Sequence, residues 1–529
     1  MNKIFKVIWN HTTQSLVVVS ELSKSKSKSR SSVDERKNVV PYALSMLSLT
    51  LPFFSPSTYA SVAISSVSDG VVTSTSATAD GGKYNIAIGD GAYAAGNSDQ
   101  TQSSIAIGSL ANASATVSLA IGPNTSASAR YSIAVGAGAI ASNQGALAFG
   151  GQSRATGQYS VAVGHGSNST GGFATSFGYH ANSTADTSVA IGYFANSSAK
   201  GSVALGDSSN ANGTHSLAIG RLSYTNAGNG IALGFSSITT GTAGTAIGAY
   251  ANSSAENSIA MGNNSNSSAA AAIAIGFVSN ATGTRSIAMG NNSTATGADS
   301  IAISSNACAT GGASIALGNL SKAGSANSIS LGNNTNTSGA NAIALGYNST
   351  VSGKNSLAVG VNNTVSARNA TAVGFNNTVS SQSTVVLGNN ISATTSSSVI
   401  LGDNASGSES VKSTTSATVN GVTYSGFAGT VSSTGKYVSV GASGDERKIV
   451  NVAAGNITAT STEAINGSQL YMVAVEAAKH SVVIAGNNTA VTATTNATTG
   501  GTDYTVDANA TTVNSTDSSV SITSSYNAT

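Results

Sequence analysis

Charged and aromatic residues are scarce in this chain of 529 residues: Asp, Glu, Lys and Arg make up 8% of it, and Phe, Trp and Tyr 5%. A compact protein of this length needs several cores of large apolar side chains, so the composition excludes an ordinary globular fold. The single cysteine, Cys308, excludes a disulfide within the chain. Only Pro123 of the four prolines lies beyond residue 60, which suits a regular hydrogen-bonded architecture.

A surplus of basic charge is also missing from the body of the chain. Residues 1–60 hold eight Lys and Arg and three Asp and Glu, so residues 61–529 hold 14 basic and 17 acidic residues. Binding to nucleic acid depends on neutralising phosphates with an excess of Lys and Arg. We therefore expect no nucleic-acid partner.

The first sixty residues have the pattern of a secretory signal. A basic run at 24–30 precedes an apolar stretch at 39–54 and the small-residue end Thr58-Tyr59-Ala60. Pro41 and Pro52 interrupt the apolar stretch, which makes it a poor membrane span, although a retained signal anchor stays as an alternative. The segment 1–24 resembles the extended signal peptide region of Gram-negative autotransporters, which implies export. We predict an extended signal peptide over 1–60 and an N-terminal linker over 61–80.

Small polar residues dominate the rest of the chain, and such a composition often indicates disorder. A strict period argues against disorder here. A glycine follows a short apolar motif at Gly108 and then at every fourteenth residue to Gly402, with Ser304 as the one exception in 22 registers. An offset copy of the motif precedes the series at Gly89.

Each of these glycines follows a large–small–large triplet, which is the period-two pattern of a β-strand. Fourteen residues with two large apolar side chains cannot fold alone, because ordering them costs about 20 kcal/mol at roughly 1.5 kcal/mol per residue. We therefore predict coils that stack, with the aliphatic rows running continuously through the stack. The residues chosen to represent this structural core are Ile105, Ile107, Gly108, Val189, Ile191, Gly192, Leu217, Ile219, Gly220, Ile287, Met289 and Gly290.

Only one strand of each short coil carries large side chains. We predict a thin, flat roll with the large residues inside and the small Ala/Ser row on the other face. A flat face of small residues lets another sheet approach closely, which favours oligomerisation but leaves the number of chains open.

The repeats Ser188-Val-Ala-Ile-Gly192 and Ser132-Ile-Ala-Val-Gly136 resemble the head repeats of YadA-like trimeric autotransporter adhesins. The resemblance covers about residues 81–406. It implies an all-β fold, a left-handed parallel β-roll solenoid of 14-residue coils, followed by a neck and a short stalk segment. It also implies a homotrimer on the bacterial cell surface that binds host extracellular matrix proteins or host cells and promotes autoagglutination.

Beyond Gly402 the period stops. We expect a β-rich connector over 407–444, a neck and short helix over 445–480, and the start of a stalk over 481–529. The neck resembles that of the same family, with a capping box at Thr460 and Glu463 that predicts a helix start; a short surface helix is the alternative. The residues that carry the neck resemblance are Arg447, Ile449, Asn451, Gly455, Asn466, Gln469 and Leu470.

The family's β-barrel anchor has no counterpart before Thr529, so we expect either a fragment or an anchorless, secreted protein, with the outer membrane reached only through an anchor outside this chain.

Other functions fit the pattern less well. The histidines His165, His180 and His215 occupy different phases of the repeat and form no aligned column of ligands, so we expect no enzyme, no cofactor and no metal site. Threonines are too scattered for an ice-binding array, and the aspartates share no fixed phase that would bind calcium. A structural solenoid spacer without a ligand of its own is the alternative to an adhesin.

Overall fold

The computed structural model describes residues 5–10, 15–20, 62–64, 67–68, 71–72, 77–80, 84–96, 103–419, 421–431, 435–477, 479, 483–487, 489–497 and 501–508. The chain divides into two units, Met1–Thr58 and Tyr59–Thr529. In the first unit β1 (Phe5–Asn10) pairs antiparallel with β2 (Ser15–Ser20). The apolar stretch 39–54 expected in the signal lies outside the described residues.

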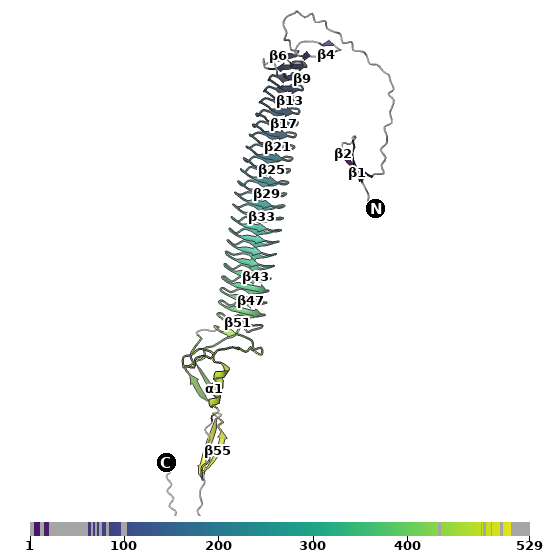
Figure 1. The fold of residues 1–529 in the computed structure, drawn as a ribbon. Coiled ribbons are helices and arrows are strands. Elements are labelled where there is room, and N and C mark those ends of the chain that lie inside the picture. Colours follow the sequence, from purple (N-terminus) through teal and green to yellow (C-terminus); the bar gives the residue numbers. More distant parts are fainter. Residues whose placement is uncertain are drawn as a thin grey trace, which may run out of the picture. The chain divides into compact units, whose positions relative to one another are not determined.

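The second unit contains a parallel β-solenoid whose coils stack along one rod (Figure 1). Each coil contributes one longer and one shorter strand, and each strand pairs in parallel with the strand 14 residues further along. Ile191 lies beside Leu205, and Leu205 beside Ile219. The predicted stacking of the aliphatic residues is therefore confirmed.

The longer strands form one ladder, which we call the aliphatic sheet. Its central residue is buried and its flanking residues are partly exposed in strand after strand. Its members are β3 (Val62–Ile64), β7 (Ile86–Ile88), β9 (Ile105–Ile107), β11 (Leu119–Ile121), β13 (Ile133–Val135), β15 (Leu147–Phe149), β17 (Val161–Val163), β19 (Thr175–Phe177), β21 (Val189–Ile191), β23 (Val203–Leu205), β25 (Leu217–Ile219), β27 (Ile231–Leu233), β29 (Thr245–Ile247), β31 (Ile259–Met261), β33 (Ile273–Ile275), β35 (Ile287–Met289), β37 (Ile301–Ile303), β39 (Ile315–Leu317), β41 (Ile329–Leu331), β43 (Ile343–Tyr347), β45 (Leu357–Val361), β47 (Thr371–Phe375), β49 (Val385–Asn389), β51 (Val399–Leu401) and β54 (Val438–Ser439).

The shorter strands form a second ladder, which we call the polar sheet because most of its outward side chains carry amides or hydroxyls. Its members are β6 (Thr78–Asp80), β8 (Tyr93–Ala95), β10 (Asn112–Ala113), β12 (Ser126–Ala127), β14 (Ile140–Ala141), β16 (Arg154–Ala155), β18 (Asn168–Ser169), β20 (Asn182–Ser183), β22 (Asn196–Ser197), β24 (Asn210–Ala211), β26 (Tyr224–Thr225), β28 (Ile238–Thr239), β30 (Asn252–Ser253), β32 (Asn266–Ser267), β34 (Asn280–Ala281), β36 (Thr294–Ala295), β38 (Cys308–Ala309), β40 (Lys322–Ala323), β42 (Asn336–Thr337), β44 (Thr350–Val351), β46 (Thr364–Val365), β48 (Thr378–Val379) and β50 (Ser392–Ala393).

Two turns join the sheets, and both use the left-handed backbone region. In one coil Phe194 has φ 51° and Gly201 has φ 65°, seven residues apart. The coil is therefore two similar half-coils of seven residues. Gly192 ends the longer strand at φ 136°, where an added Cβ would meet the carbonyl of Gly206 in the next coil. This close approach explains why glycine recurs at that register.

The interior of the solenoid is made of small residues, which corrects one prediction. In a single coil Ala195, Ser197, Ser202 and Ala204 are all fully buried. The Oγ atoms of Ser197 and Ser202 lie 2.6 Å apart across the coil, so the two sheets are too close to hold branched side chains between them. The pleat then places the aliphatic residues on either side of each central residue on the outer face.

Larger side chains enter the interior only near the C-terminal end of the solenoid. Strands β43, β45, β47 and β49 run on through the repeat glycine and are five residues long. Val365, Ile391 and Ile400 are buried in these coils, as are Asn363 and Asn377. Asn377 Nδ2 donates to the carbonyl of Gly388 at 2.7 Å, and Asn377 Oδ1 accepts from the backbone N–H of Ile391 at 3.0 Å.

Both ends of the solenoid differ from the expected boundaries. Segment 61–80, expected as a linker, supplies β3, which pairs in parallel with β7, and β6, which pairs with β8. A small hairpin of β4 (Val67–Ser68) and β5 (Val71–Val72) lies between them in sequence. At the other end β54 returns from the connector to pair with β51.

The remaining elements are short. The connector contains an antiparallel hairpin of β52 (Ser416–Val419) and β53 (Val422–Ser425). Helix α1 (Gly467–Ala477) follows, and β55 (Thr489–Thr495) pairs antiparallel with β56 (Thr502–Ala508).

The predicted capping box at Thr460 is wrong. Asn466 caps the helix instead, because its Oδ1 accepts from the backbone N–H of Ser468 at 3.2 Å. Glu463 accepts from the backbone N–H of Asn456 at 2.8 Å.

Candidate functional site

The outer face of the aliphatic sheet carries two rows of large apolar side chains. Ile191 is 36% exposed and Met289 40%, and the other aliphatic residues chosen as the core are partly exposed. Ile105, Ile107, Val189, Leu217, Ile219 and Ile287 occupy the same two outward rows. These residues line the outside of the single chain, and the central alanines between them form the core.

The polar sheet carries a ladder of amides. Asn168 Nδ2 donates to Asn182 Oδ1 at 2.8 Å, and Asn182 Nδ2 donates to Asn196 Oδ1 at 2.7 Å. A second run joins Asn252, Asn266 and Asn280 in the same way. The two faces of the solenoid are therefore chemically unlike, one apolar and one made of neutral hydrogen-bonding groups.

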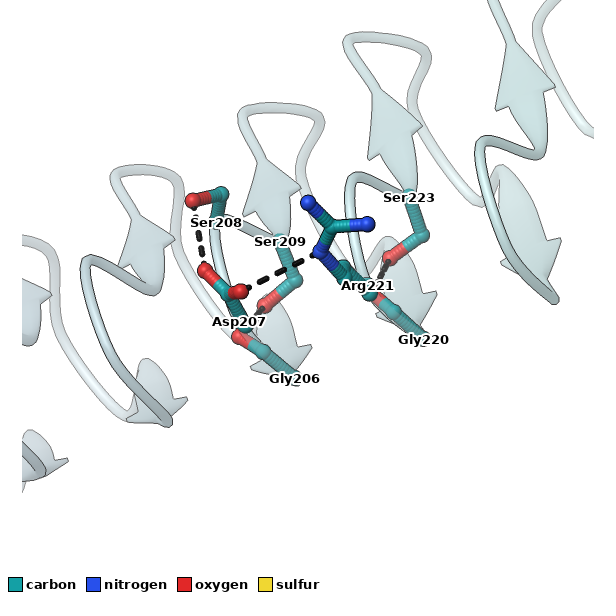
Figure 2. Close-up of polar contacts among 7 residues, drawn as sticks. All are labelled: Gly206, Asp207, Ser208, Ser209, Gly220, Arg221 and Ser223. Carbon is teal, nitrogen blue, oxygen red and sulfur yellow. Dashed lines mark hydrogen bonds and ion pairs between the residues drawn. The ribbon is translucent and has the colours of Figure 1, made fainter.

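The turn edges bring together side chains that lie 14 residues apart in sequence. Figure 2 shows Arg221 beside Asp207 of the preceding coil, with Nε 3.3 Å from Oδ2. Ser209 and Ser223 each donate their Oγ to the carbonyl of the repeat glycine of their own turn, at 2.9 and 2.8 Å (Figure 2). The turns are thus closed by hydroxyls, and the charged tips face solvent.

Aromatic and histidine rings form two adjoining columns on this same turn edge. His165, Tyr179 and Tyr193 stack with ring centroids 5.5 and 5.3 Å apart. His180 stacks on Phe194 at 5.2 Å and meets Tyr179 edge-on at 4.3 Å. Tyr193 is 53% exposed and Phe194 47%, so the columns form an apolar patch outside the aliphatic sheet. We call this patch the aromatic cluster.

The neck residues form two contact groups. Arg447 donates Nη1 to the carbonyl of Val440 at 2.8 Å and Nη2 to the carbonyl of Asp403 at 2.6 Å, which ties the neck to the last coil. Gln469 Nε2 donates to the carbonyl of Gly455 at 2.6 Å, and Asn466 Nδ2 donates to that of Val452 at 3.0 Å. Asn451 has φ 62°, and Ile449 and Leu470 are 71% and 58% exposed.

No metal site and no membrane-spanning helix appear within the ranges described. There, no group of three or more His, Cys, Asp or Glu side chains is placed to hold a metal ion. No helix of those ranges is both long and apolar enough to cross a membrane.

Comparison with protein families assigns both regular parts of the chain. Residues 1–50 match the Extended Signal Peptide of the Type V secretion system. The YadA head domain repeat, in two copies, matches ten segments of the solenoid. These are 117–139, 141–167, 169–195, 197–223, 253–279, 281–303, 309–335, 338–363, 352–377 and 366–390.

The leader and the fold together define an exported β-solenoid of the type V secretion system. The chain belongs to the YadA-like family of trimeric autotransporter adhesins. It is thus an exported cell-surface autotransporter, as the resemblance of its repeats implied.

Two solved structures are similar to parts of the chain. The C-terminal YadA-like domain of a Burkholderia pseudomallei protein is 36% identical, with 27% of this chain and 48% of that chain covered and a TM-score of 0.15. This chain thus spans about half the length of that one. The collagen-binding domain of the Yersinia adhesin YadA is 22% identical, with 45% and 85% covered and a TM-score of 0.18. No curated protein sequence matches the chain.

Sequence reasoning missed the aromatic cluster. The signal was present, because His165, Tyr179 and Tyr193 follow one another at intervals of 14. We compared the histidines only with one another, and His180 is one register position away from that column. A column in a solenoid mixes residue types, so a search for one type at one phase overlooks it.

Proposed function

We propose that the chain acts as a parallel homotrimer in which the aliphatic sheets of three copies face one another. The observation that supports this is the pair of outward aliphatic rows, which continue through the stack and remain half-exposed in one chain. Contiguous apolar surface on this scale is rare on monomers and is typical of an interface. The number three comes from the family.

The polar sheet is the less suitable face for assembly. Its amide ladders already satisfy one another along the rod, as between Asn196 Nδ2 and Asn210 Oδ1 at 3.1 Å. Burying them would remove their contact with water and gain little apolar area. The aliphatic sheet therefore faces the partners, and the polar sheet and the turns face outward.

Sedimentation equilibrium of the purified chain tests this assembly. We expect a mass three times the 51.6 kDa of one chain. The double variant Leu217→Ser and Ile219→Ser places hydroxyls in the apolar rows and should dissociate the trimer. The matched control Asn210→Ser changes the polar sheet of a neighbouring strand and should leave the mass unchanged. A monomeric parent chain, or a trimer indifferent to both changes, contradicts the proposal.

We also propose that the head binds host extracellular matrix proteins or host cell surfaces and promotes autoagglutination. The single observation that supports adhesion is the aromatic cluster, because exposed aromatic side chains outside an assembly face are typical of partner binding. It is formed by turns, which leaves it apart from the rows assigned to the trimer.

Adhesion is tested by coating the purified chain onto plates and measuring binding to collagen, fibronectin, laminin and cultured host cells. We expect binding to at least one of them. The double variant Tyr179→Ala and Phe194→Ala should weaken it at least tenfold. Tyr347→Ala, which removes a similarly exposed ring elsewhere, should not. A folded trimer that binds none of them would be a spacer, as would be one whose binding ignores the cluster.

The lower part of the chain is proposed to work as an adapter. The contacts of Arg447 to the last coil and of Gln469 to Gly455 support a neck over 445–480 that leads from the head to a stalk. The exposed Ile449 and Leu470 would then be covered by the partner copies. Attachment to the outer membrane is proposed only by way of the family's anchor domain.

A further inference from the structure

A groove runs along the turn edge of the solenoid opposite the aromatic cluster. It has a volume of about 530 Å³ and is lined by residues of successive coils between Asn143 and Lys200. This volume lies within the range of about 300–1,000 Å³ that is typical of small-molecule sites. None of the lining residues belongs to the outward rows of the aliphatic sheet.

The groove exists because one column of the turn loses a side chain. Gln158, Gly172, Asp186 and Lys200 follow at intervals of 14 along one edge, so Gly172 leaves a gap between an amide and a carboxylate. An added Cβ at Gly172 would lie 3.3 Å from Asp186 Oδ1, which shows how directly that carboxylate borders the gap.

An exposed aromatic ring borders the gap. Phe173 is 61% exposed, and its ring stacks on Tyr159 with centroids 5.4 Å apart at 22°. The stacking holds the ring in one orientation without burying it. The groove therefore combines a fixed apolar surface with polar side chains.

The charged groups of the groove do not neutralise each other. Asp186 Oδ1 accepts from the backbone N–H of Gly172 at 2.9 Å, which fixes the carboxylate. Among the described residues Asp186 and Lys200 form no ion pair with each other, although Arg221 and Asp207 do so at the same sequence interval. One carboxylate and one ammonium group thus remain available to a ligand in the groove.

We propose that this groove binds a neutral oligosaccharide. Sugar hydroxyls both donate and accept hydrogen bonds, and Asn143, Gln158, Asp186 and Lys200 supply both functions. The apolar C–H groups of a sugar ring match the exposed Phe173. One positive and one negative charge give no net attraction for a polyanion, which disfavours sulfated or nucleic-acid chains.

This inference rests on the proposed adhesive function, because it names a ligand class for the surface of the same exported head. It differs from binding to matrix proteins at the aromatic cluster, which lies on the other turn edge. Separate variants can therefore test the two sites.

Isothermal titration of the purified full chain with neutral hexasaccharides of glucose, N-acetylglucosamine, mannose and galactose tests the proposal, with heparin as the anionic comparison. We expect at least one neutral chain to bind. Phe173→Ala and Gly172→Leu should each weaken that binding at least tenfold, the first by removing the apolar surface and the second by filling the gap. Phe277→Ala removes a comparably exposed ring in a distant coil and should have no effect.

The outcomes separate this inference from the adhesive function. No binding of any neutral chain, binding of heparin alone, or binding unaffected by both groove variants in a folded chain overturns the inference. If matrix or cell binding persists in those cases, the adhesive function stands without the sugar site. Unchanged far-ultraviolet circular dichroism identifies the variants that remain folded, and Asp186→Asn, which keeps the side-chain shape, serves as a third variant.

Discussion

Arg285 and Asp299, which are 14 residues apart, form a two-pronged ion pair across neighbouring coils. Nε lies 2.6 Å from Oδ1, and Nη2 lies 2.8 Å from Oδ2. Parallel arrangements with one residue per coil place equivalent turn positions directly beside each other, so opposite charges at one register meet without any local sequence neighbourhood. The pair crosses from one coil to the next and reports whether that stacking is intact.

This ion pair predicts a titration effect. The hydrogen bond from Arg285 holds the pKa of Asp299 below its ordinary value, and the positive charge of the guanidinium adds to this. A lowered carboxylate pKa contributes stability above the unfolded pKa of about 3.9, and that stability is lost as the pH falls through the folded pKa. Both side chains are exposed, so the effect on overall stability is small.

The measurement is the titration of the Asp299 carboxyl carbon by nuclear magnetic resonance. Arg285→Gln should return the pKa of Asp299 toward its ordinary value. Arg221→Gln, which removes an ion-pair partner in another coil, should leave it unchanged. An Asp299 pKa that does not respond to Arg285→Gln would mean that the two coils are not in the observed register.

The reversed placement of small and large residues gives a second prediction. Ala204 is fully buried between Ala190 and Ala218 of the neighbouring coils, whereas Leu205 is 39% exposed. Ala204→Leu inserts bulk into the narrow interior and should lower the free energy of unfolding by about 1–3 kcal/mol. Leu205→Ala should leave each coil folded and weaken self-association instead.

Thermal unfolding and sedimentation of both variants distinguish the two placements. If the large residues formed the interior, Leu205→Ala would open a cavity and destabilise the coil, and Ala204→Leu would be tolerated on the surface. That reversed pair of results would refute the observed packing.

Much of the fold follows from the sequence because the period acts at every level. The spacing of 14 between Gly192 and Gly206 gives the coil length, and the triplet before each glycine gives the strand. The direction in which the strand faces does not follow. Alternation is symmetric, so the pattern of Val203, Ala204 and Leu205 fits either placement. The distance between the two sheets decides it, and that distance depends on both turns.

The functional surface was harder to foresee for a related reason. The groove depends on Gly172 lying beside Phe173 and between side chains 14 residues away on either side. A linear reading shows Gly171-Gly172-Phe173 as one more turn. Only when the chain is folded into coils does the missing side chain become a gap with a carboxylate at its border.

The one repeat register without glycine gives a third prediction. Ser304 has φ 108°, in a region that residues with a Cβ rarely adopt, between Gly290 and Gly318 at φ 134° and 133°. Such strain costs about 1–3 kcal/mol, part of which is offset by the lower entropy of unfolded serine. Ser304→Gly should therefore raise the melting temperature of the chain.

Ser305→Gly is the matched control, because the neighbouring serine does not have a positive φ. It should leave the melting temperature unchanged or slightly lower. A fall in melting temperature with Ser304→Gly, equal to that of the control, would show that the serine is not strained at this register.

The buried asparagines near the end of the solenoid give a fourth prediction. Asn377 donates to the carbonyl of Gly388 and to Asn363 Oδ1, and it accepts from the backbone N–H of Ile391. Asn377→Ala leaves these buried groups without partners, at a cost of about 1–3 kcal/mol for each unsatisfied group. We expect the C-terminal coils to loosen first, because the change acts on one end of a stack in which each coil contacts only its neighbours.

Hydrogen exchange measured along the chain can locate this loosening. In Asn377→Ala the backbone amides of β47, β49 and β51 should exchange faster, whereas those of β21 to β35 keep the protection of the parent chain. Thr378→Ala changes the exposed neighbour on β48 and should alter neither region. Uniformly faster exchange along the whole solenoid would mean that the coils unfold as one unit, and the local role assigned to Asn377 would then be wrong.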